Sequence, residues 1–208
     1  MLQEFALVVP VKPLVVGKSR LTGIDDEQRR ALAQAFALDT LAVCLDVGAA
    51  GVLVLTDDAT FSARCSALGC ATVPDGDSND LNAALAQAAA EARRRWPDVA
   101  PVALCADLPA LSADDLREAL GLVPAGTPAF VSDAERTGTT LYTASYDRFK
   151  PRFGVGSRQA HLSTGATEIG GGLPTLRRDV DDLDDLRAAI ALGVGSETRR
   201  LAHLVAVV

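Results

Sequence analysis

Apolar runs of strand length alternate along this chain with longer segments in which apolar residues recur at helical spacing. The strand-length runs are residues 5–11, 51–58, 70–74 and 102–106, and the helical segments are residues 25–47, 59–69, 78–96 and 112–123. Parallel strands have this apolar character because helices cover both faces of their sheet. The alternation therefore predicts a mostly parallel central sheet between two layers of helices.

The last third of the chain adds further elements. Residues 128–133 and 139–145 are two strand candidates separated by a polar loop, which favours antiparallel pairing. Residues 173–192 predict a strand and then a helix, and residues 196–204 a final helix. No linker or repeat divides the sequence. We predict one domain over residues 1–208, a three-layer α/β/α sandwich that is Rossmann-like in the broad sense.

Composition excludes several classes of protein. The 208 residues carry a formal net charge of −7, whereas surfaces that bind nucleic acids or anionic membranes are basic. No apolar run approaches the roughly 20 residues of a membrane-spanning helix, and no basic segment precedes the first strand as in a signal peptide. We expect a cytoplasmic protein whose four cysteines are reduced thiols. With two histidines, it cannot hold a multi-histidine zinc site.

Polar residues follow the predicted strands. In open α/β sheets, ligands bind beyond the carboxyl ends of the strands. Asp107 comes directly after the strand in "LCADLPAL", and Thr56 and Asp57 end the strand in "VLTDD". A carboxylate at such a strand end has no packing role, so we expect Asp107 to hold a ligand.

The loop after the first strand is rich in cations. It contains Lys12, Lys18 and Arg20, although the whole chain has only three lysines. This enrichment predicts an anion clamp, most naturally for a polyphosphate, and the alternative is a solvated loop. Neither a GxxxxGK[ST] loop nor a GxGxxG fingerprint is present, which disfavours a P-loop ATPase and a dinucleotide-dependent dehydrogenase.

A pair of carboxylates stands near the end of the chain. In the sequence "RRDVDDLDDL", Asp179 and Asp181 lie two positions apart, so in an extended segment they project to one face and Val180 to the other. With Asp107 they would offer the oxygen ligands that Mg²⁺ prefers. The alternative is a charged helix start, which is our interpretation for the acids that follow, Asp182, Asp184 and Asp185.

The sequence "FGVGSRQAH" predicts a glycine turn that leads into a helix. Gly154 and Gly156 permit backbone angles closed to other residues, and Ser157 can cap the helix that follows. A helix start beside small residues favours anion binding, and the alternative is a plain turn. His161 on this helix is expected to pack rather than to act as a base. Thr139, in "TGTTLY", adds a hydroxyl group.

Seven motifs in order resemble one family. They are "VPVKPLVVGKSRL", "VLTDD", "NDLNAAL", "LCADLPAL", "TGTTLYTA", "FGVGSRQAH" and "RRDVDDLDDL". Together they resemble the phosphoenolpyruvate and 2-phospho-L-lactate guanylyltransferases of coenzyme F-420 biosynthesis, over roughly residues 5–190. The combination of "PVK…KSRL" with "FGxGS…H" is specific, whereas "ADLP" recurs in many nucleotidyltransferases. The resemblance implies a GT-A-like nucleotidyltransferase fold.

The resemblance also implies roles for particular residues. Four groups of three residues are involved: the Mg²⁺ ligands Asp107, Asp179 and Asp181; the acceptor pocket of Thr139, Gly154 and Ser157; the clamp on the triphosphate of GTP, Lys12, Lys18 and Arg20; and the guanosine side, Thr56, Asp57 and Asn82. Catalysis is assigned to Asp107 and the three cations. The acceptor's phosphate is ionised at neutral pH, so no catalytic base is expected.

The identity of the acceptor is left open. Seventeen arginines against three lysines are typical of a high-GC bacterial genome, which among relatives favours phosphoenolpyruvate. 2-Phospho-L-lactate and 3-phosphoglycerate are the alternatives, and the product would pass to the next enzyme of the pathway. Other classes are a molybdenum-cofactor nucleotidyltransferase, a glycosyltransferase and a non-catalytic nucleotide-binding module. The sequence does not decide between a monomer and a homodimer.

Overall fold

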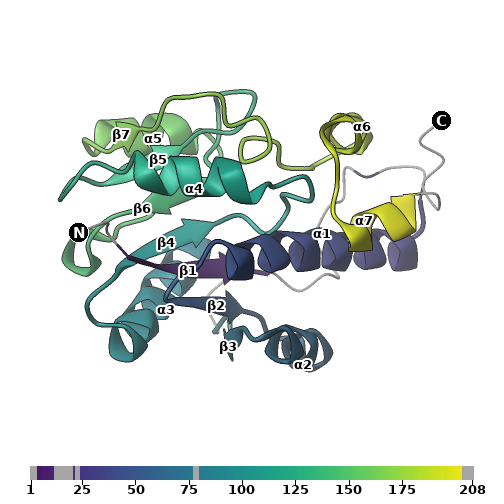
Figure 1. The fold of residues 1–208 in the computed structure, drawn as a ribbon, viewed down its shortest axis with the longest axis horizontal. Coiled ribbons are helices and arrows are strands. Elements are labelled where there is room, and N and C mark those ends of the chain that lie inside the picture. The colour runs from purple at the N-terminus through teal and green to yellow at the C-terminus, as the bar shows by residue number, and fades with distance from the viewer. Residues whose placement is uncertain (1–3, 12–20, 22–23, 77–79, 203–208) are drawn as a thin grey trace.

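The structure of the protein, a computed structural model, describes residues 4–11, 21, 24–76 and 80–202. Strands and helices alternate through the first half of the chain as predicted (Figure 1). The elements there are β1 (Phe5–Pro10), α1 (Asp26–Asp46), β2 (Gly51–Leu55), α2 (Ala59–Leu68), β3 (Ala71–Val73), α3 (Leu81–Arg95), β4 (Ala100–Leu104) and α4 (Ala113–Gly121). The second half contains β5 (Ala129–Val131), β6 (Leu141–Thr143), the 3₁₀ turn η1 (Tyr146–Arg148), α5 (Ser157–Ser163), β7 (Thr167–Glu168), α6 (Leu183–Leu192) and α7 (Ser196–Leu201).

The strands of the described residues form one sheet in the order β3-β2-β1-β4-β6-β5-β7. Strand β6 runs antiparallel to both of its neighbours, and the other pairs are parallel. The prediction of a mostly parallel sheet with an antiparallel section is therefore confirmed. From β1 the chain moves outward to β2 and β3 and then returns to the other side of β1 as β4. The gap between β1 and β4 is thus a topological switch point, where α/β sheets bind ligands.

Successive side chains of the central strands pack alternately into two hydrophobic cores, one on each face of the sheet. On β1, Phe5, Leu7 and Val9 pack in one cluster, whereas Ala6 and Val8 pack in the other. Helices α1, α2 and α4 cover the first face, and α3 and α5 lie on the second (Figure 1). The predicted three-layer sandwich is confirmed, because a strand buried on both faces requires helices on both sides.

A predicted strand before α6 is wrong. Residues 174–177 form a turn, and the last strand of the sheet is instead β7. The hydroxyl of Thr175 donates to Asp115 at 2.7 Å, and its backbone N–H donates to the same carboxylate at 2.8 Å. This segment therefore binds the start of α4 rather than a neighbouring strand.

In the sequence, Ser112 and Asp115 have the spacing of a capping box for α4, with Asp in place of the usual Glu, and the same contacts correct this prediction. Ser112 accepts from the Asp115 N–H at 3.1 Å, as an N-cap should. The second bond of a capping box, from the Ser112 N–H to the Asp115 carboxylate, is not part of this cap. The Asp115 carboxylate instead accepts from Thr175. Within the described residues, the structure contains no helix long and apolar enough to cross a membrane.

Candidate active site

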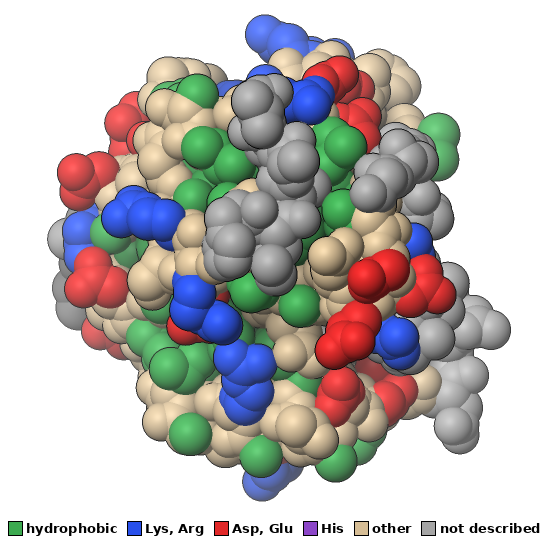
Figure 2. Space-filling view, turned by 90° about the vertical axis from the view of Figure 1, so that its right-hand side faces the viewer, with side chains coloured by type: hydrophobic (Ala, Val, Ile, Leu, Met, Phe, Trp, Pro, Cys, Tyr) green, Lys and Arg blue, Asp and Glu red, His purple; other side chains and the backbone are tan. Residues whose placement is uncertain are grey.

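The predicted site residues that the structure describes lie at one edge of the sheet. Asp107 follows β4, Thr56 and Asp57 follow β2, Asn82 stands in the first turn of α3, and Thr139 precedes the antiparallel β6. All of these positions are at the carboxyl ends of the parallel strands, toward the right of Figure 1. Figure 2 faces this side, where acidic side chains gather at the right and several lysine or arginine side chains lie to the left.

The segment after β4 that carries Asp107 is held by a side chain of α1. Thr40, a fully buried residue of α1, accepts from the Leu108 N–H at 3.2 Å and lies 3.1 Å from the Ala106 carbonyl oxygen. Its hydroxyl thus binds the backbone on both sides of Asp107. Sequence analysis missed Thr40, because a threonine within an apolar helix face has no distinguishing pattern.

The predicted carboxylate pair lies beside Asp107. The Val180 N–H donates to the Asp107 carbonyl oxygen at 3.0 Å. Val180 is fully buried, whereas Asp179 and Asp181 on either side of it are half-buried. The prediction that Val180 turns away from its acidic neighbours is confirmed, and a metal site shared by Asp107, Asp179 and Asp181 stays a prediction.

The acids after Asp181 begin a helix, as expected. Asp182 is the N-cap of α6 and forms a reciprocal capping box with Asp185. Asp185 also accepts from the Asp181 N–H at 3.1 Å and from Arg178 at 3.2 Å. The cap of α6 therefore also holds the backbone of the carboxylate pair.

The three carboxylates fit Mg²⁺ in their chemistry. Hard oxygen ligands suit this ion, and Asp107, Asp179 and Asp181 are joined through the backbone contact at Val180. Among the residues that the structure describes, however, no three histidine, cysteine, aspartate or glutamate side chains close on a common point as metal ligands would.

The predicted acceptor residues gather around His161. The Thr139 hydroxyl lies 3.0 Å from His161 Nδ1, and Ser157 is one turn earlier on the same helix, α5. Ser157 N–H donates to the Gly154 carbonyl oxygen at 3.1 Å. Thr139 is thus joined to α5 through His161, and Gly154 is joined to the start of α5 through Ser157.

His161 is a neutral packing residue. The Arg152 N–H donates to Nε2 at 2.9 Å, so the ring proton is on Nδ1 and points to Thr139. The ring is fully buried between Phe130 and Tyr142. Burial lowers the pKa of His161 from 6.5 to about 4. The expectation that His161 is a packing residue is confirmed, and the absence of a catalytic base stays a prediction.

The predicted cap of α5 is displaced by one residue. Gly156, with φ of 70°, is the N-cap, and Ser157 is already helical and almost fully buried. The left-handed angle explains the glycine, because other residues rarely adopt it. Gly154, with φ of 130°, also needs the freedom that the sequence predicted.

Asn82 is hydrogen-bonded to the backbone of the segment that leads to the predicted acceptor residues. Its amide accepts from the Phe153 N–H at 2.7 Å and donates to the Phe153 carbonyl at 3.0 Å. These bonds hold the segment that leads to Gly154. On the other side of the edge, Asp57 accepts from the Asp75 N–H at 3.0 Å and Thr56 is buried. Contact of these residues with guanosine stays a prediction.

Lys12, Lys18 and Arg20, the predicted triphosphate clamp, lie outside the described residues. The cysteines of the chain are free thiols, as expected, and three of them are buried. Burial raises the pKa of Cys65 to about 12 and that of Cys70 to about 11. These thiols are therefore inert at neutral pH.

The fold is that of nucleotidyltransferases. A protein from Desulfovibrio desulfuricans G20 superposes with a TM-score of 0.73 at 17% identity, covering 98% of this chain and 97% of its own. A nucleotidyl transferase from Methanothermobacter superposes with a TM-score of 0.64 at 17% identity, covering 91% and 97%. At such identities the likeness concerns the fold alone.

Sequence comparison defines the family. A family model described as guanylyl transferase CofC like matches residues 5–202. The phosphoenolpyruvate guanylyltransferase of Thermomonospora curvata is 47% identical, covering 95% of this chain and 88% of the relative. The protein of the same name from Streptomyces scabiei is 45% identical and covers 96% of both chains. The chain belongs to the CofC-like guanylyl transferase family, as its motifs predicted.

Proposed function

We propose that the protein transfers GMP from GTP to phosphoenolpyruvate, giving enolpyruvyl-diphospho-5′-guanosine and pyrophosphate. The observation that carries the proposal is 47% identity, over 95% of the chain, to a relative named phosphoenolpyruvate guanylyltransferase. The gathering of polar residues at the switch point between β1 and β4 supports it. By its motifs, we assign the reaction to coenzyme F-420 biosynthesis in the cytoplasm, before the enzyme that consumes the labile product.

The proposed reaction needs little proton chemistry. An oxygen of the acceptor's phosphate attacks the α-phosphorus of GTP, a new P–O bond forms, and the bond to the leaving pyrophosphate breaks. Because a phosphate monoester is ionised at neutral pH, its oxygen is already a nucleophile. The neutral, buried His161 agrees with a site that uses no base. Catalysis then depends on positioning and on neutralising two polyanions.

The acceptor pocket is proposed to consist of Thr139, Gly154 and Ser157. Hydroxyl and backbone N–H groups at these positions would bind the phosphate and the carboxylate of phosphoenolpyruvate. The Thr139 hydroxyl receives the Nδ1 proton of His161, which leaves its own proton to donate to an anion. His161 would thereby orient Thr139 without touching the substrate.

Asp107, Asp179 and Asp181 are proposed to hold Mg²⁺. The backbone bond between Val180 and Asp107 supports this assignment, since it keeps the three carboxylates at one sheet edge. When bound, the ion would stabilise negative charge on the phosphoryl oxygens. Lys12, Lys18 and Arg20 are proposed to bind the triphosphate, and Thr56, Asp57 and Asn82 to lie near the guanosine.

The test is Mg²⁺-dependent pyrophosphate release from GTP, and in parallel from ATP and CTP, with one acceptor at a time. Phosphoenolpyruvate, 2-phospho-L-lactate and 3-phosphoglycerate are supplied separately, and the next pathway enzyme traps the product. We expect release with phosphoenolpyruvate. Release only with another acceptor would correct the substrate, and release only with ATP or CTP would correct the nucleotide. If the folded protein releases no pyrophosphate in any combination, the proposed enzyme activity is overturned.

A further inference from the structure

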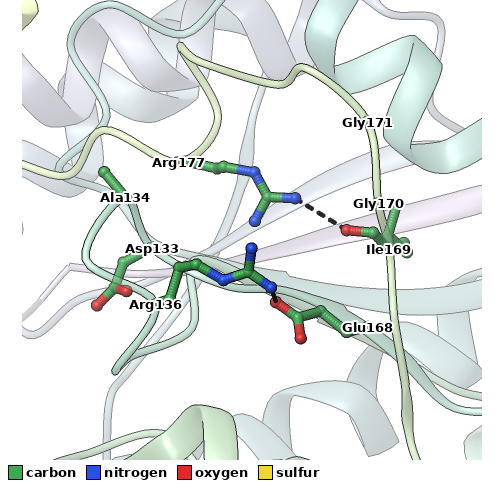
Figure 3. A pocket seen from close by; sticks show the side chains of 8 residues that line it. All are labelled: Asp133, Ala134, Arg136, Glu168, Ile169, Gly170, Gly171 and Arg177. Carbon is green, nitrogen blue, oxygen red and sulfur yellow. Dashed lines mark hydrogen bonds and ion pairs between the residues drawn. The ribbon is translucent and has the colours of Figure 1, made fainter.

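A second pocket opens at the carboxyl end of β5 and β7, outside the residues assigned to the nucleotide, the acceptor and the metal. Its cavity of about 310 Å³ is lined by Asp133, Ala134, Arg136, Glu168, Ile169, Gly170, Gly171 and Arg177 (Figure 3). This volume is at the lower end of ligand pockets, which hold roughly 300–1,000 Å³. It therefore suits a small molecule rather than a nucleotide.

Two guanidinium groups extend side by side across this pocket (Figure 3). Arg177 is fixed, because it donates to the Ser132 carbonyl at 2.9 Å, the Ser132 hydroxyl at 2.7 Å and the Ile169 carbonyl at 2.9 Å. Arg136 is 67% exposed, and within the described residues its guanidinium contacts only Glu168, at 3.5 Å. Burial lowers the pKa of Arg177; the charge of Glu168 opposes this effect, and the smaller influences of Arg136 and Asp133 oppose each other.

The acids of the pocket are already bound by other groups. Asp133 accepts from the N–H groups of Thr137 at 2.9 Å and Gly138 at 2.7 Å. Glu168 accepts from Arg158 at 2.7 Å and from the Ser132 hydroxyl at 2.8 Å. Two arginines and two carboxylates line the pocket, and Arg158 beside it forms the shorter ion pair with Glu168, at 2.7 Å against 3.5 Å for Arg136. Arg136 is therefore the less tightly paired of the two arginines that contact Glu168.

We propose that this pocket binds a small anion, through a phosphate or carboxylate group held between Arg136 and Arg177. The planar forks of two arginines match the oxygens of such a group, and the anion would remove the repulsion between them. Arg136 also has φ of 59°, a left-handed angle that is uncommon outside glycine. That strained backbone angle belongs to the residue that supplies the exposed guanidinium.

The pocket adjoins the acceptor residues through the backbone. The turn that Asp133 closes ends at Gly138, beside Thr139, and the Arg158 N–H donates to the Thr137 carbonyl at 3.2 Å. An anion between Arg136 and Arg177 would stabilise this turn. The site itself does not depend on the proposed function, whereas its link to acceptor binding does.

The experiment is calorimetric titration of the full chain with inorganic phosphate and, separately, with malonate, without nucleotide or Mg²⁺. We expect Arg136→Gln to weaken binding by about tenfold or more, since it removes charged hydrogen bonds. Arg200→Gln is the matched control, because Arg200 is 64% exposed and pairs with one acid. Weakening for phosphate alone, malonate alone or both identifies the anion class.

Unchanged affinity in Arg136→Gln would overturn the proposal, as would a wild-type protein that binds neither anion. The affinity of phosphate for the acceptor pocket should not change in Arg136→Gln, so the substitution distinguishes the two sites. Amide exchange gives a second measurement: phosphate should slow exchange at Thr137 and Gly138 in the wild type but not in Arg136→Gln. If pyrophosphate release fails while this binding persists, only the proposed function is wrong.

Discussion

The Val180 N–H donates to the Asp107 carbonyl oxygen at 3.0 Å, and this bond joins the end of β4 to the segment that begins α6. Burial of Val180 fixes the pairing, because its side chain packs with Phe36, Leu186 and Ala189. The carboxylates on either side of Val180 are thereby held at the switch point of the sheet. A hydrophobic contact thus positions the polar residues of the proposed site.

Asp107→Asn should abolish turnover while the protein stays folded. The amide keeps the shape of the side chain but removes a negative ligand. The loss of several kcal/mol of charge stabilisation corresponds to a rate lower by on the order of a thousandfold. Pyrophosphate release measures the rate, and circular dichroism checks the fold. A fully active variant would contradict the assignment of Asp107.

Thr40→Val should lower both stability and kcat, because it leaves backbone groups beside Asp107 without their partner. We expect a loss of about 1–3 kcal/mol in the free energy of unfolding, and at least a tenfold lower kcat. Thr143→Val is the matched control, since buried Thr143 donates to Pro101 at the other end of β4, at 2.9 Å. It should lose stability but keep kcat, and Thr40→Ser should keep both. Equal kcat values in the two valine variants would argue against a positioning role.

Asn82→Asp should raise the KM for the acceptor by about tenfold, which corresponds to the loss of about one hydrogen bond between neutral groups. The carboxylate cannot donate to the Phe153 carbonyl, so the segment before Gly154 is less well held. Gln87→Glu makes the same chemical change at an exposed position of α3 and should have no effect. A rise in the KM for GTP instead would show that Asn82 acts on the nucleotide side.

His161 should make the protein less stable as the pH falls from 7 to 5. Its pKa is lowered to about 4 in the folded state, whereas an unfolded histidine titrates near 6.5. Between these values the unfolded chain binds a proton that the folded chain does not, so acid favours unfolding. The contribution is about 2 kcal/mol at pH 5, and it is absent above pH 7. Urea unfolding measures the loss in the free energy of unfolding between pH 7 and pH 5. This loss should be larger in the wild type than in His161→Gln by about 2 kcal/mol. The same pH dependence in both proteins would contradict the burial of a neutral imidazole.

Gly195→Ala should destabilise the docking of α7 on α1. The Asp39 carboxylate accepts from Glu197 N–H at 3.0 Å and Thr198 N–H at 2.8 Å. An added Cβ at Gly195 would lie 2.3 Å from Asp39 Cγ, so the cap must shift. We expect a loss of about 1–3 kcal/mol, measured as a lower Tm. Gly172→Ala, where nothing lies within 4 Å, should leave Tm unchanged.

The layers of the fold and the edge that carries the site follow from the amino-acid sequence alone. Strands such as β1 have to place alternate residues in two cores, and this requirement is visible in each segment alone. The sequence also indicates that Asp107 follows a central strand, because strand ends coincide with the ends of apolar runs. The family could be inferred from the order of its motifs.

Which polar groups contact one another, in contrast, depends on the packed fold. Asp115 binds Thr175 instead of completing its own helix cap, Thr40 lies under Asp107, and Arg136 and Arg177 share a pocket. These partners come from separate elements, and their meeting depends on the order and register of strands. Local periodicity reflects the burial of one element at a time, whereas such contacts depend on how all of the elements pack together.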